Sequence, residues 1–392
     1  MSERGVLMVT GAYWPELSGG GLQCRTMIHA LRDRFRFRVL TTCTDPALPR
    51  VSEVEGTPVR RIPIDVSSRL SKVWAAVQTV RFFLAERGTF EIVHLHGFSQ
   101  KSVLIVLLAR LSRKRIILTI HTAGSDEAAA ARQAGWVTYW AYRQADLFLA
   151  ISSRIAHNYV AAGLPTTRLR QAPNGVDVDR FHPPSRPERL AARQGLQSLS
   201  DDLYWILFVG FFSREKGPDV LFEAWLRLRE MGAPPSGLIF VGDTDSAYHE
   251  VDRTLAAAIA ARAAELGVSD RVRFTGPMAN VETAYHAADV FVMPSSREAF
   301  GMVLVEAMAS GLPVVASRID HVTDEIVDDG VTGHLVPAND PAALADALML
   351  VLRAPAEAQK LGVHAREAVV SRYSLEAARQ RWLDAYAAVQ VK

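Results

Sequence analysis

Short, continuous apolar runs alternate with longer amphipathic stretches along the first half of the chain. Apolar runs of roughly four to eight residues are typical of strands that are buried on both faces. The stretches between them repeat apolar residues at helical spacing, as from Leu22 to Asp33. This alternation predicts an α/β domain with a parallel sheet. The predicted strands are residues 5–10, 36–42, 91–96, 115–121, 146–152 and 169–173.

The same pattern starts again in the second half, after a turn at residues 174–177 and a proline-rich segment at residues 183–187. A chain of 392 residues is long for one hydrophobic core and sufficient for two. We therefore expect an α/β fold with two domains, residues 1–177 and 178–374, and a last helix over residues 375–392. The predicted strands of the second half are residues 203–210, 239–243, 271–276, 288–293, 314–316 and 330–336, and its predicted helices are residues 219–230, 302–309 and 341–370.

One segment of the second half, residues 295–313 (SSREAFGMVLVEAMASGLP), links a strand that ends at Pro294 to a helix that begins near Gly301. The start of a helix exposes backbone N–H groups and the positive end of the helix dipole, which suits a phosphate. Glu298 lies in the loop before this helix and Glu306 lies within it. Both carboxylates can therefore face a ligand at the helix start. The alternative is that both are solvated surface residues.

The two glutamates are separated by seven residues, with Phe300-Gly301 between them and the sequence GLPVV at residues 311–315 after them. This motif resembles that of retaining nucleotide-sugar glycosyltransferases of the GT-B type, and most closely the large bacterial family 4. The resemblance extends over nearly the whole chain. It implies two Rossmann-like α/β/α domains that face each other across a cleft. The first would bind the acceptor, the second would bind the donor, and the helix over residues 375–392 would cross back to the first.

The loop after the first strand of the second half also matches the family in part. The family pattern is glycine, arginine, four residues, lysine and glycine, and Gly210, Lys216 and Gly217 fit it. Phe211 stands where the family has arginine, so we expect Arg214 to supply the missing cation. Two cations beside a helix start can neutralise a diphosphate leaving group. A second difference from the family pattern follows residue 317, where the chain has Arg-Ile-Asp-His instead of the glycine-rich turn that the family usually has.

In the first half, the candidate ligand-binding residues follow predicted strands. Gly20 and Gly21 form part of a glycine-rich turn between the first strand and its helix, where backbone can approach a phosphate. By the resemblance, they lie against the donor diphosphate or the acceptor. His121 ends another strand and matches a family histidine that contacts the donor sugar. His94 and His96 have the spacing of two metal ligands on one strand, but no third ligand accompanies them, so we expect both to be structural.

The resemblance implies a reaction in which the protein supplies positioning and electrostatic stabilisation rather than a nucleophile. Lys216, Arg214 and the N–H groups after Phe300 would stabilise the departing diphosphate. Glu298 would bind sugar hydroxyls, Glu306 the ribose hydroxyls, and His121 the sugar from the first domain. The candidate catalytic residues are His121, Lys216, Arg214 and Glu298, and the candidate donor-binding residues are Gly20, Gly21, Gly210, Phe300, Gly301, Met302, Val303 and Glu306.

The sequence predicts no required metal and no cofactor other than the nucleotide diphosphate sugar itself, as a co-substrate. Residues Asp243, Thr244 and Asp245 mimic the Asp-x-Asp metal site of a different glycosyltransferase fold. That fold lacks a second sheet, so we interpret Asp243 as a turn residue at a strand end.

Charge is divided unevenly between the two halves. Residues 1–175 hold 23 Lys and Arg against 12 Asp and Glu, a balance of +11, whereas the rest of the chain holds 21 against 30, a balance of −9. A basic first half suggests an anionic partner, either a phosphorylated acceptor or an anionic membrane surface, or else a solvated bias with no partner. The basic, aromatic segment at residues 66–87 is either an interfacial helix or a helix that covers the sheet with Trp74 and Phe83 in the core.

The sequence also indicates a cellular compartment and argues against one class of partner. No apolar stretch of about 18 residues is present and the two cysteines form no disulfide scaffold, so we expect a cytoplasmic protein, peripheral on the inner face of the plasma membrane if it meets a membrane. The basic residues are dispersed and no recognition motif accompanies them, which argues against nucleic acid.

The function expected is transfer of a hexosyl group from a UDP-, GDP- or ADP-sugar to a sugar, lipid or small-molecule acceptor. Two alternatives remain open from the sequence. One is a sugar-nucleotide epimerase of the same fold, which would act without any acceptor. The other is a degenerate nucleotide-binding partner protein without catalysis, which the departures at Phe211 and near His321 suggest.

Overall fold

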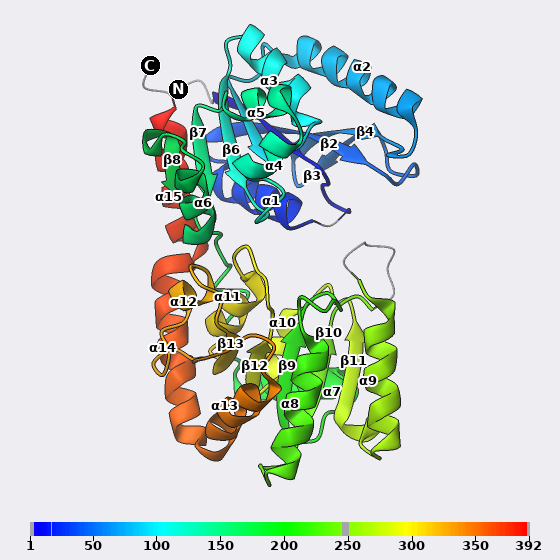
Figure 1. Ribbon diagram of the computed structural model, residues 1–392, viewed down its shortest axis with the longest axis vertical. Coiled ribbons are helices and arrows are strands. Elements are labelled where there is room, and N and C mark those ends of the chain that lie inside the picture. The colour runs from blue at the N-terminus through cyan, green and yellow to red at the C-terminus, as the bar shows by residue number, and fades with distance from the viewer. Residues whose placement is uncertain (1–3, 17, 245–250, 390–392) are drawn as a thin grey trace. The chain divides into compact units, whose positions relative to one another are not determined.

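The structure is a computed structural model that describes residues 4–16, 18–244 and 251–389. These residues form two compact units (Figure 1). One unit comprises the described residues up to Gly175 together with those from Glu376 on, and the other runs from Val176 to Leu375. The first unit is therefore built from both ends of the chain, whereas the second is one continuous segment.

The first unit contains an eight-stranded sheet in the order β3-β4-β2-β1-β5-β6-β7-β8. Neighbouring strands run parallel, apart from the antiparallel pair β3 and β4. The order of the strands reverses between β1 and β5, and in such sheets ligands bind beyond the carboxyl ends of the strands near this point. The strands are β1 (Arg4–Thr10), β2 (Phe35–Cys43), β3 (Val51–Val54), β4 (Thr57–Pro63), β5 (Ile92–His96), β6 (Arg115–Ile120), β7 (Leu147–Ala150) and β8 (Leu169–Gln171).

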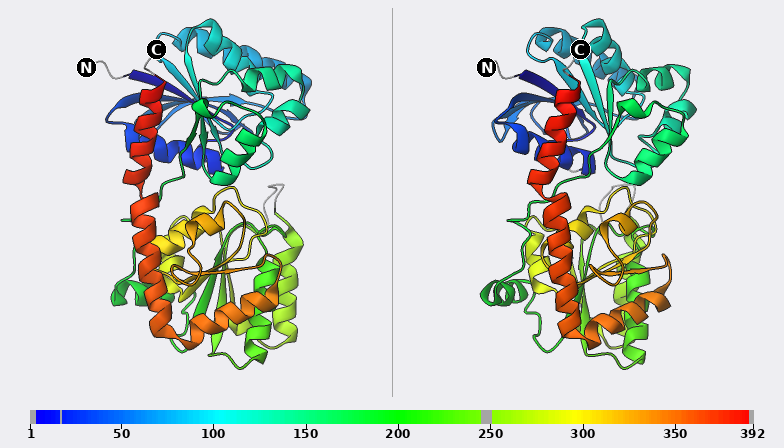
Figure 2. Two further views of the ribbon diagram at one scale, coloured as in Figure 1. Left: turned by 60° about the vertical axis from the view of Figure 1, so that its left-hand side comes forward. Right: turned by 90° about the vertical axis from the view of Figure 1, so that its left-hand side faces the viewer.

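Helices cover both faces of this sheet, with α2, α3 and α5 on one face and α1 and α15 on the other (Figure 1, Figure 2). The C-terminal helix α15 is part of the core, because Trp382 and Tyr386 are buried against Met27 of α1. The helices of this unit are α1 (Gly19–Leu31), α2 (Arg69–Glu86), α3 (Ser102–Leu111), α4 (Ala128–Gln133), α5 (Trp136–Tyr142), α6 (Ser153–Ala161), the 3-10 turn η1 (Thr166–Arg168) and α15 (Leu375–Ala388).

The second unit contains a six-stranded sheet in the order β11-β10-β9-β12-β13-β14, and its neighbouring strands are all parallel. Its core includes Phe208, Phe212 and Trp225, which are almost completely buried between the sheet and its helices. The strands are β9 (Tyr204–Val209), β10 (Ser236–Val241), β11 (Val272–Gly276), β12 (Val290–Met293), β13 (Val314–Ser317) and β14 (His334–Val336).

The strands of the second unit place the loops after β9 and β12 at the same edge of the sheet, because β9 and β12 are parallel neighbours. The helices of this unit are α7 (Arg186–Gly195), α8 (Pro218–Glu230), α9 (Arg253–Glu265), the 3-10 turn η2 (Ser269–Arg271), α10 (Glu282–Ala287), α11 (Met302–Ala309), α12 (Thr323–Ile326), α13 (Pro341–Arg353) and α14 (Pro355–Tyr373).

The predicted fold class, two parallel-sheet α/β units, is confirmed, with two local corrections. The proline-rich segment contains a helix, α7, whose N-cap Ser185 and Glu188 form a reciprocal capping box with Pro187 in the first turn. The helical pattern over residues 341–370 is two helices, because Pro355 lacks an N–H group and disfavours helical backbone at Ala354. Within the described part of the chain, no helix is long and apolar enough to cross a bilayer.

Candidate functional site

The glutamate motif of the second unit begins where β12 ends. Gly301 precedes α11 with a φ of +101°, a left-handed conformation that glycine adopts without strain. No side chain caps this helix, so the N–H groups of its first turn, from Met302 and Val303, are open to an external acceptor. The predicted strand, loop and helix around residues 290–309 are thus present. Their geometry offers an anion site at the start of α11.

Lys216 and Glu298, two of the predicted catalytic residues, meet beside this loop. Nζ of Lys216 lies 2.6 Å from Oε1 of Glu298, and both side chains are largely shielded from solvent. The buried Ser295 hydroxyl donates a hydrogen bond to the same Glu298 oxygen at 2.9 Å. The loops after β9 and β12 therefore bring one cation and one carboxylate together, and Ser295 fixes the carboxylate.

Close backbone contacts hold these two loops together. A Cβ at Gly217, which has a φ of +67°, would lie 2.7 Å from the carbonyl oxygen of Pro294. A Cβ at Gly242 would lie 1.9 Å from the carbonyl oxygen of Gly210, so the β10 loop is equally close to the β9 loop. The N–H of Ser296 also donates to the carbonyl of Glu215 at 2.8 Å. A side chain at Gly217 would separate the loops that carry Lys216 and Glu298, and one at Gly242 would separate the β10 loop from the β9 loop.

Arg214 is not part of the Lys216–Glu298 cluster. Its guanidinium lies 3.8 Å from Asp219 and 3.8 Å from Asp252, and its side chain is largely exposed. Phe211, which replaces the family arginine, is exposed. In this arrangement Arg214 pairs with the first turn of α8 and the N-cap of α9, so it would have to turn away from both carboxylates to reach a diphosphate.

Glu306 lies on α11 beside the buried Tyr285, whose hydroxyl donates a hydrogen bond to Oε2 of Glu306 at 2.9 Å. Burial raises the pKa of Glu306 to about 7, although the hydrogen bond from Tyr285 and the nearby Arg180 lower it. The carboxyl group is therefore close to half protonated at neutral pH. Phe300 is buried and packs its ring against Tyr373 at a centroid distance of 5.7 Å.

Three histidines form a stacked row in the first unit. His94 and His96 stack with ring centroids 4.5 Å apart, and His96 and His121 stack at 5.2 Å. His94 is held by Tyr386 of α15 at 2.8 Å and by Thr119 at 2.7 Å, as expected for a structural residue. Nδ1 of His96 lies 3.0 Å from Nε2 of His121, so His96 orients the predicted sugar-binding histidine.

This contact determines which nitrogen of His121 carries a proton. Burial lowers the pKa of His121 to about 4, so the ring is neutral at pH 7. If His121 donated to His96, then His96 would hold its own proton on Nε2, which is buried and has no acceptor among the described residues. A buried, unpaired N–H group is costly. His96 therefore donates, and His121 keeps its proton on Nδ1 as a neutral donor.

The predicted glycines lie next to this row. A Cβ at Gly20 would contact the His121 ring at 3.4 Å, and a Cβ at Gly21 would lie 2.3 Å from the carbonyl oxygen of Ala12. Gly20, in the first turn of α1, and His121, just after β6, are thus neighbours. The sequence analysis missed Asp126, whose carboxylate accepts from the N–H groups of His121 and Thr122 and orders the loop after β6. No motif marks this aspartate.

The described residues contain no cluster of three or more His, Cys, Asp or Glu side chains that could hold a metal ion. Asp243 follows β10 as a strand-end residue, and Asp245 lies outside the described residues. The free cysteines Cys24 and Cys43 are both buried.

Two family models match the chain. The model of Glycosyltransferase Family 4 matches residues 17–180, and the model of glycosyl transferases group 1 matches residues 195–368. A D-inositol 3-phosphate glycosyltransferase of Geodermatophilus obscurus is 33% identical over an alignment of 346 residues, which covers 80% of this chain and 73% of that protein. The chain belongs to glycosyltransferase family 4.

A second relative is a phosphatidyl-myo-inositol mannosyltransferase of Mycobacterium leprae, which is 32% identical over an alignment of 317 residues that covers 79% of this chain and 77% of that protein. This family 4 chain is therefore a glycosyltransferase.

Solved structures agree on the fold of this family 4 protein. HepE of Anabaena in complex with UDP and glucose matches with a TM-score of 0.78 at 19% identity, over 98% of this chain and all of that one. Sucrose-phosphate synthase of Thermosynechococcus elongatus matches with a TM-score of 0.78 at 24% identity, over 98% of both chains. These likenesses show the GT-B fold that the sequence predicts.

Proposed function

We propose that this family 4 enzyme is a retaining glycosyltransferase that moves a hexosyl group from a nucleotide diphosphate sugar to an acceptor without a required metal. The Lys216–Glu298 pair beside the uncapped start of α11 is the observation that carries this proposal. A cation and free N–H groups suit the two phosphates of a donor, and a carboxylate suits sugar hydroxyls. Within the second unit, these groups converge on one small region.

In the proposed reaction, the bond between the anomeric carbon and the diphosphate oxygen breaks, and a new bond to the acceptor oxygen forms on the same face of the sugar. The acceptor hydroxyl proton passes to the departing phosphate oxygen. Lys216 leaves Glu298 and stabilises the charge that develops on the diphosphate, together with the N–H groups of Met302 and Val303. Glu298, still held by Ser295, accepts hydrogen bonds from the sugar, and Glu306 accepts from the ribose.

The first unit contributes the candidate ligand-binding residues Gly20, Gly21 and His121, with His121 as a neutral hydrogen-bond donor. We propose an acceptor that carries a polyol phosphate, because relatives at about one-third identity are named for inositol 3-phosphate and phosphatidyl-myo-inositol. Of the donor bases expected, UDP is the first to test, since HepE was solved with UDP and with UDP-glucose. The two free, buried cysteines fit a cytoplasmic location.

The test combines a panel of UDP-, GDP- and ADP-sugars with inositol phosphates, phosphatidylinositol and simple sugars as acceptors, with and without EDTA. We expect product with the anomeric configuration of the donor, formed equally in EDTA. Glu298→Ala and Lys216→Ala should each reduce transfer by about a hundred- to a thousandfold, as loss of one preorganised stabilising group does.

The matched control is Glu215→Ala with Arg297→Ala, because these residues form a solvent-exposed ion pair of 3.3 Å between the same two loops. Transfer by this double variant should stay within a few-fold of the wild type. Full transfer by the Glu298 and Lys216 variants would refute the site. Conversion of the donor without any acceptor would indicate an epimerase, and binding of nucleotide without turnover would indicate a partner protein.

A further inference from the structure

Trp14 lies in the loop between β1 and α1 and is 44% exposed. This loop follows β1 at the carboxyl edge of the first sheet, next to the point where the strand order reverses. Ligands of such sheets bind at this edge. The same loop runs on to Gly20, which lies beside His121. Trp14 is therefore an exposed aromatic residue on a loop of the candidate ligand-binding edge, and the transfer reaction as proposed does not use it.

A buried arginine of β4 fixes the backbone at Trp14. The guanidinium of Arg61 donates to the carbonyl oxygen of Trp14 at 2.6 Å. It also donates to the Ser52 hydroxyl at 2.5 Å and to the carbonyl oxygen of Pro49 at 3.3 Å. Arg61 is only 2% exposed, and no carboxylate among the described residues pairs with it. Burying a cation among neutral oxygens costs free energy, which is understandable where a loop has to hold a ligand in a defined position.

Further hydrogen bonds tie this loop to the end of β2 and the residues that follow it. The Thr42 hydroxyl donates to the carbonyl oxygen of Gly11 at 2.6 Å. On the other side of Trp14, Oε1 of Glu16 accepts from the N–H groups of Thr44 at 2.9 Å and Asp45 at 3.2 Å. The loop is thus held before and after Trp14. A ligand would meet a preformed surface and would lose little affinity to the ordering of the loop.

The surroundings of the indole ring favour a neutral ligand. The guanidinium of Arg25 lies over one face of the ring, 4.8 Å from its centroid, and Arg25 is paired with Glu55. With Arg25 on one face, the other face is the one left for a ligand. The indole N–H donates to no residue in the described ranges, so it can donate to a ligand hydroxyl. Because Arg25 and Glu55 neutralise each other, this place offers an aromatic face and a donor rather than a net charge.

We propose that Trp14 stacks on the ring of the acceptor and so selects acceptors that contain a pyranose or cyclitol ring. This inference rests on the proposed transfer function, whose acceptor site it specifies. One face of such a ring carries mainly C–H groups, whose partial positive charge is attracted to the negative face of an indole. An acyclic polyol has no such face and gains nothing from Trp14. A protein partner fits less well, because charged side chains such as Arg25 and Glu55 are rare in the core of a protein interface.

Binding of soluble probes to the full chain, measured by isothermal titration with and without UDP, tests this inference without a transfer step. The cyclic probes are D-inositol 3-phosphate and methyl α-D-mannopyranoside, and the acyclic probe is glycerol 3-phosphate, which keeps a phosphate but has no ring. Trp14→Ala should weaken binding of a cyclic probe by about tenfold, whereas Trp14→Phe, which keeps an aromatic face, should stay within about threefold of the wild type. Affinities for glycerol 3-phosphate and UDP should not change.

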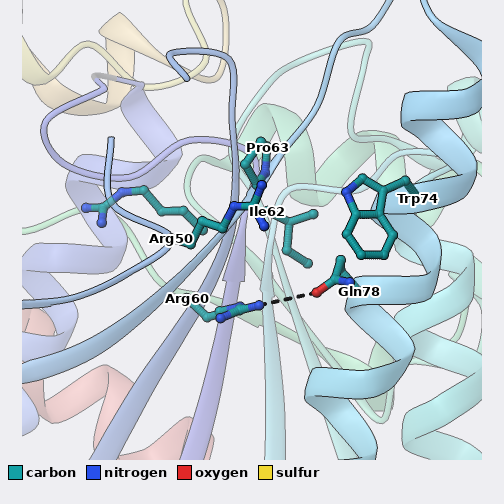
Figure 3. A pocket seen from close by; sticks show the side chains of 7 residues that line it. Arg50, Arg60, Ile62, Pro63, Trp74 and Gln78 are labelled. Atoms are coloured by element: carbon teal, nitrogen blue, oxygen red, sulfur yellow. Dashed lines mark hydrogen bonds between the residues drawn. The ribbon is translucent and has the colours of Figure 1, made fainter. Parts of the chain in front are cut away.

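The matched control is Trp74→Ala. One interpretation of the sequence places Trp74 and Phe83 of α2 in the core, which is confirmed for Phe83, whereas Trp74 is 47% exposed and lies beside Pro63 and Gln78 (Figure 3). Trp74 thus matches Trp14 in exposure, but α2 covers the face of the sheet opposite to α1 (Figure 1). Trp74→Ala should bind every probe like the wild type, and all variants should keep the wild-type melting temperature.

Three results would overturn the proposal: equal binding of cyclic probes by Trp14→Ala and the wild type, no binding of either cyclic probe by the wild type, or a parallel loss of UDP affinity in Trp14→Ala, which would give Trp14 a merely structural role. Failure of the transfer function is a separate result, since the chain would then bind cyclic probes through Trp14 but transfer no sugar from any donor. With an active donor, Trp14→Ala should raise the KM for a cyclic acceptor by about tenfold and leave the KM for the donor unchanged.

Discussion

The carboxyl group of Glu306 is poised between two protonation states, because burial raises its pKa to about 7. A ribose hydroxyl donates more strongly to a carboxylate than to a neutral carboxyl group. Affinity for a sugar nucleotide should therefore fall as the pH is lowered from 8 through 7 to 6. Isothermal titration with the preferred donor across this range measures the effect, and an affinity independent of pH would contradict the assignment of Glu306 to the ribose.

Removal of the Tyr285 hydroxyl provides a sharper version of this test. The hydroxyl donates to Glu306 and so stabilises its charged form. In Tyr285→Phe the pKa of Glu306 should rise further, and the pH at which donor affinity falls should move upward by the same amount. Tyr204→Phe, at the start of β9, is the control and should leave the pH profile in place. An unchanged profile in Tyr285→Phe would show that Tyr285 only fills space.

The histidine row predicts how stability depends on pH. Burial lowers the pKa of His94 to about 3 and that of His121 to about 4, whereas both rise to about 6.5 on unfolding. The unfolded chain therefore binds more protons below pH 6.5, and the folded state loses stability as the pH falls from 6.5 toward 4. In that window, each histidine should lower the free energy of unfolding by about 1.4 kcal/mol for every pH unit of acidification. Urea unfolding at pH 7.5, 6.5 and 5.5 measures the loss, and equal stability at the three values would contradict buried, neutral imidazoles.

At the scale of elements, a buried ion pair fastens α7 to the second unit. Arg193 donates to Asp289 at 2.8 Å and to the carbonyl of Ala287 at 3.1 Å, and Asp289 also accepts from the N–H of Trp205. Arg193→Ala would leave the shielded Asp289 carboxylate paired only with Arg189 of the same helix and would remove the bond to Ala287, so we expect a loss of about 1.5–3 kcal/mol. Urea unfolding should show that loss, whereas Arg186→Ala, at the exposed start of α7, should change stability by less than about 0.5 kcal/mol. Equal effects of the two would show that α7 is not fastened through Arg193.

The same helix shows where sequence reasoning reached its limit. Buried strands such as β5 and β12 are continuous apolar runs, so their positions follow from the pattern alone. Helix α7 has a strongly polar sequence, and the prolines at residues 183, 184 and 187 are typical of a linker. The feature that marks its start is the cap formed by Ser185 and Glu188. Edge strand β3 is short and mostly exposed, and the neighbouring strand β4 is interrupted by Pro58, Arg60 and Arg61, so no apolar run marks either. A hydrophobic pattern reveals buried elements, whereas α7 is defined by its N-cap and β3 by its pairing at the edge of the sheet.

Some features of the candidate site can likewise be predicted from the sequence, and others cannot. The spacing of Glu298 and Glu306 around a helix start is local in sequence, so it could be predicted. The ion pair between Lys216 and Glu298 was not predicted, because it joins residues 82 positions apart. Nor could the sequence show that Tyr285 adjusts the charge of Glu306 or that Asp126 orders the loop at His121. These contacts depend on how strands are ordered in the sheet.

At the scale of the whole molecule, α15 makes the C-terminus a structural part of the first unit. Trp382 is almost completely buried in the core that α1 and the sheet form. Trp382→Ala should lower the free energy of unfolding of this unit by about 3–5 kcal/mol, the usual cost of deleting a buried indole. Gln380→Ala, an exposed position on the same helix, should have no measurable effect. Urea unfolding followed by circular dichroism measures both, and equal stability would contradict the packing of α15.

A unit assembled from both ends of one chain imposes an order on biosynthesis. The segment up to Gly175 leaves the ribosome before the second unit, yet the helix that fills its core emerges only after that unit. The second unit, which is continuous, can complete its core during translation, whereas the first must wait for residues beyond Glu376. Until then, the apolar surface on which Trp382 and Tyr386 pack is open to chaperones or to aggregation. A chain released after Leu375 would therefore have a complete second unit and an unfinished first one.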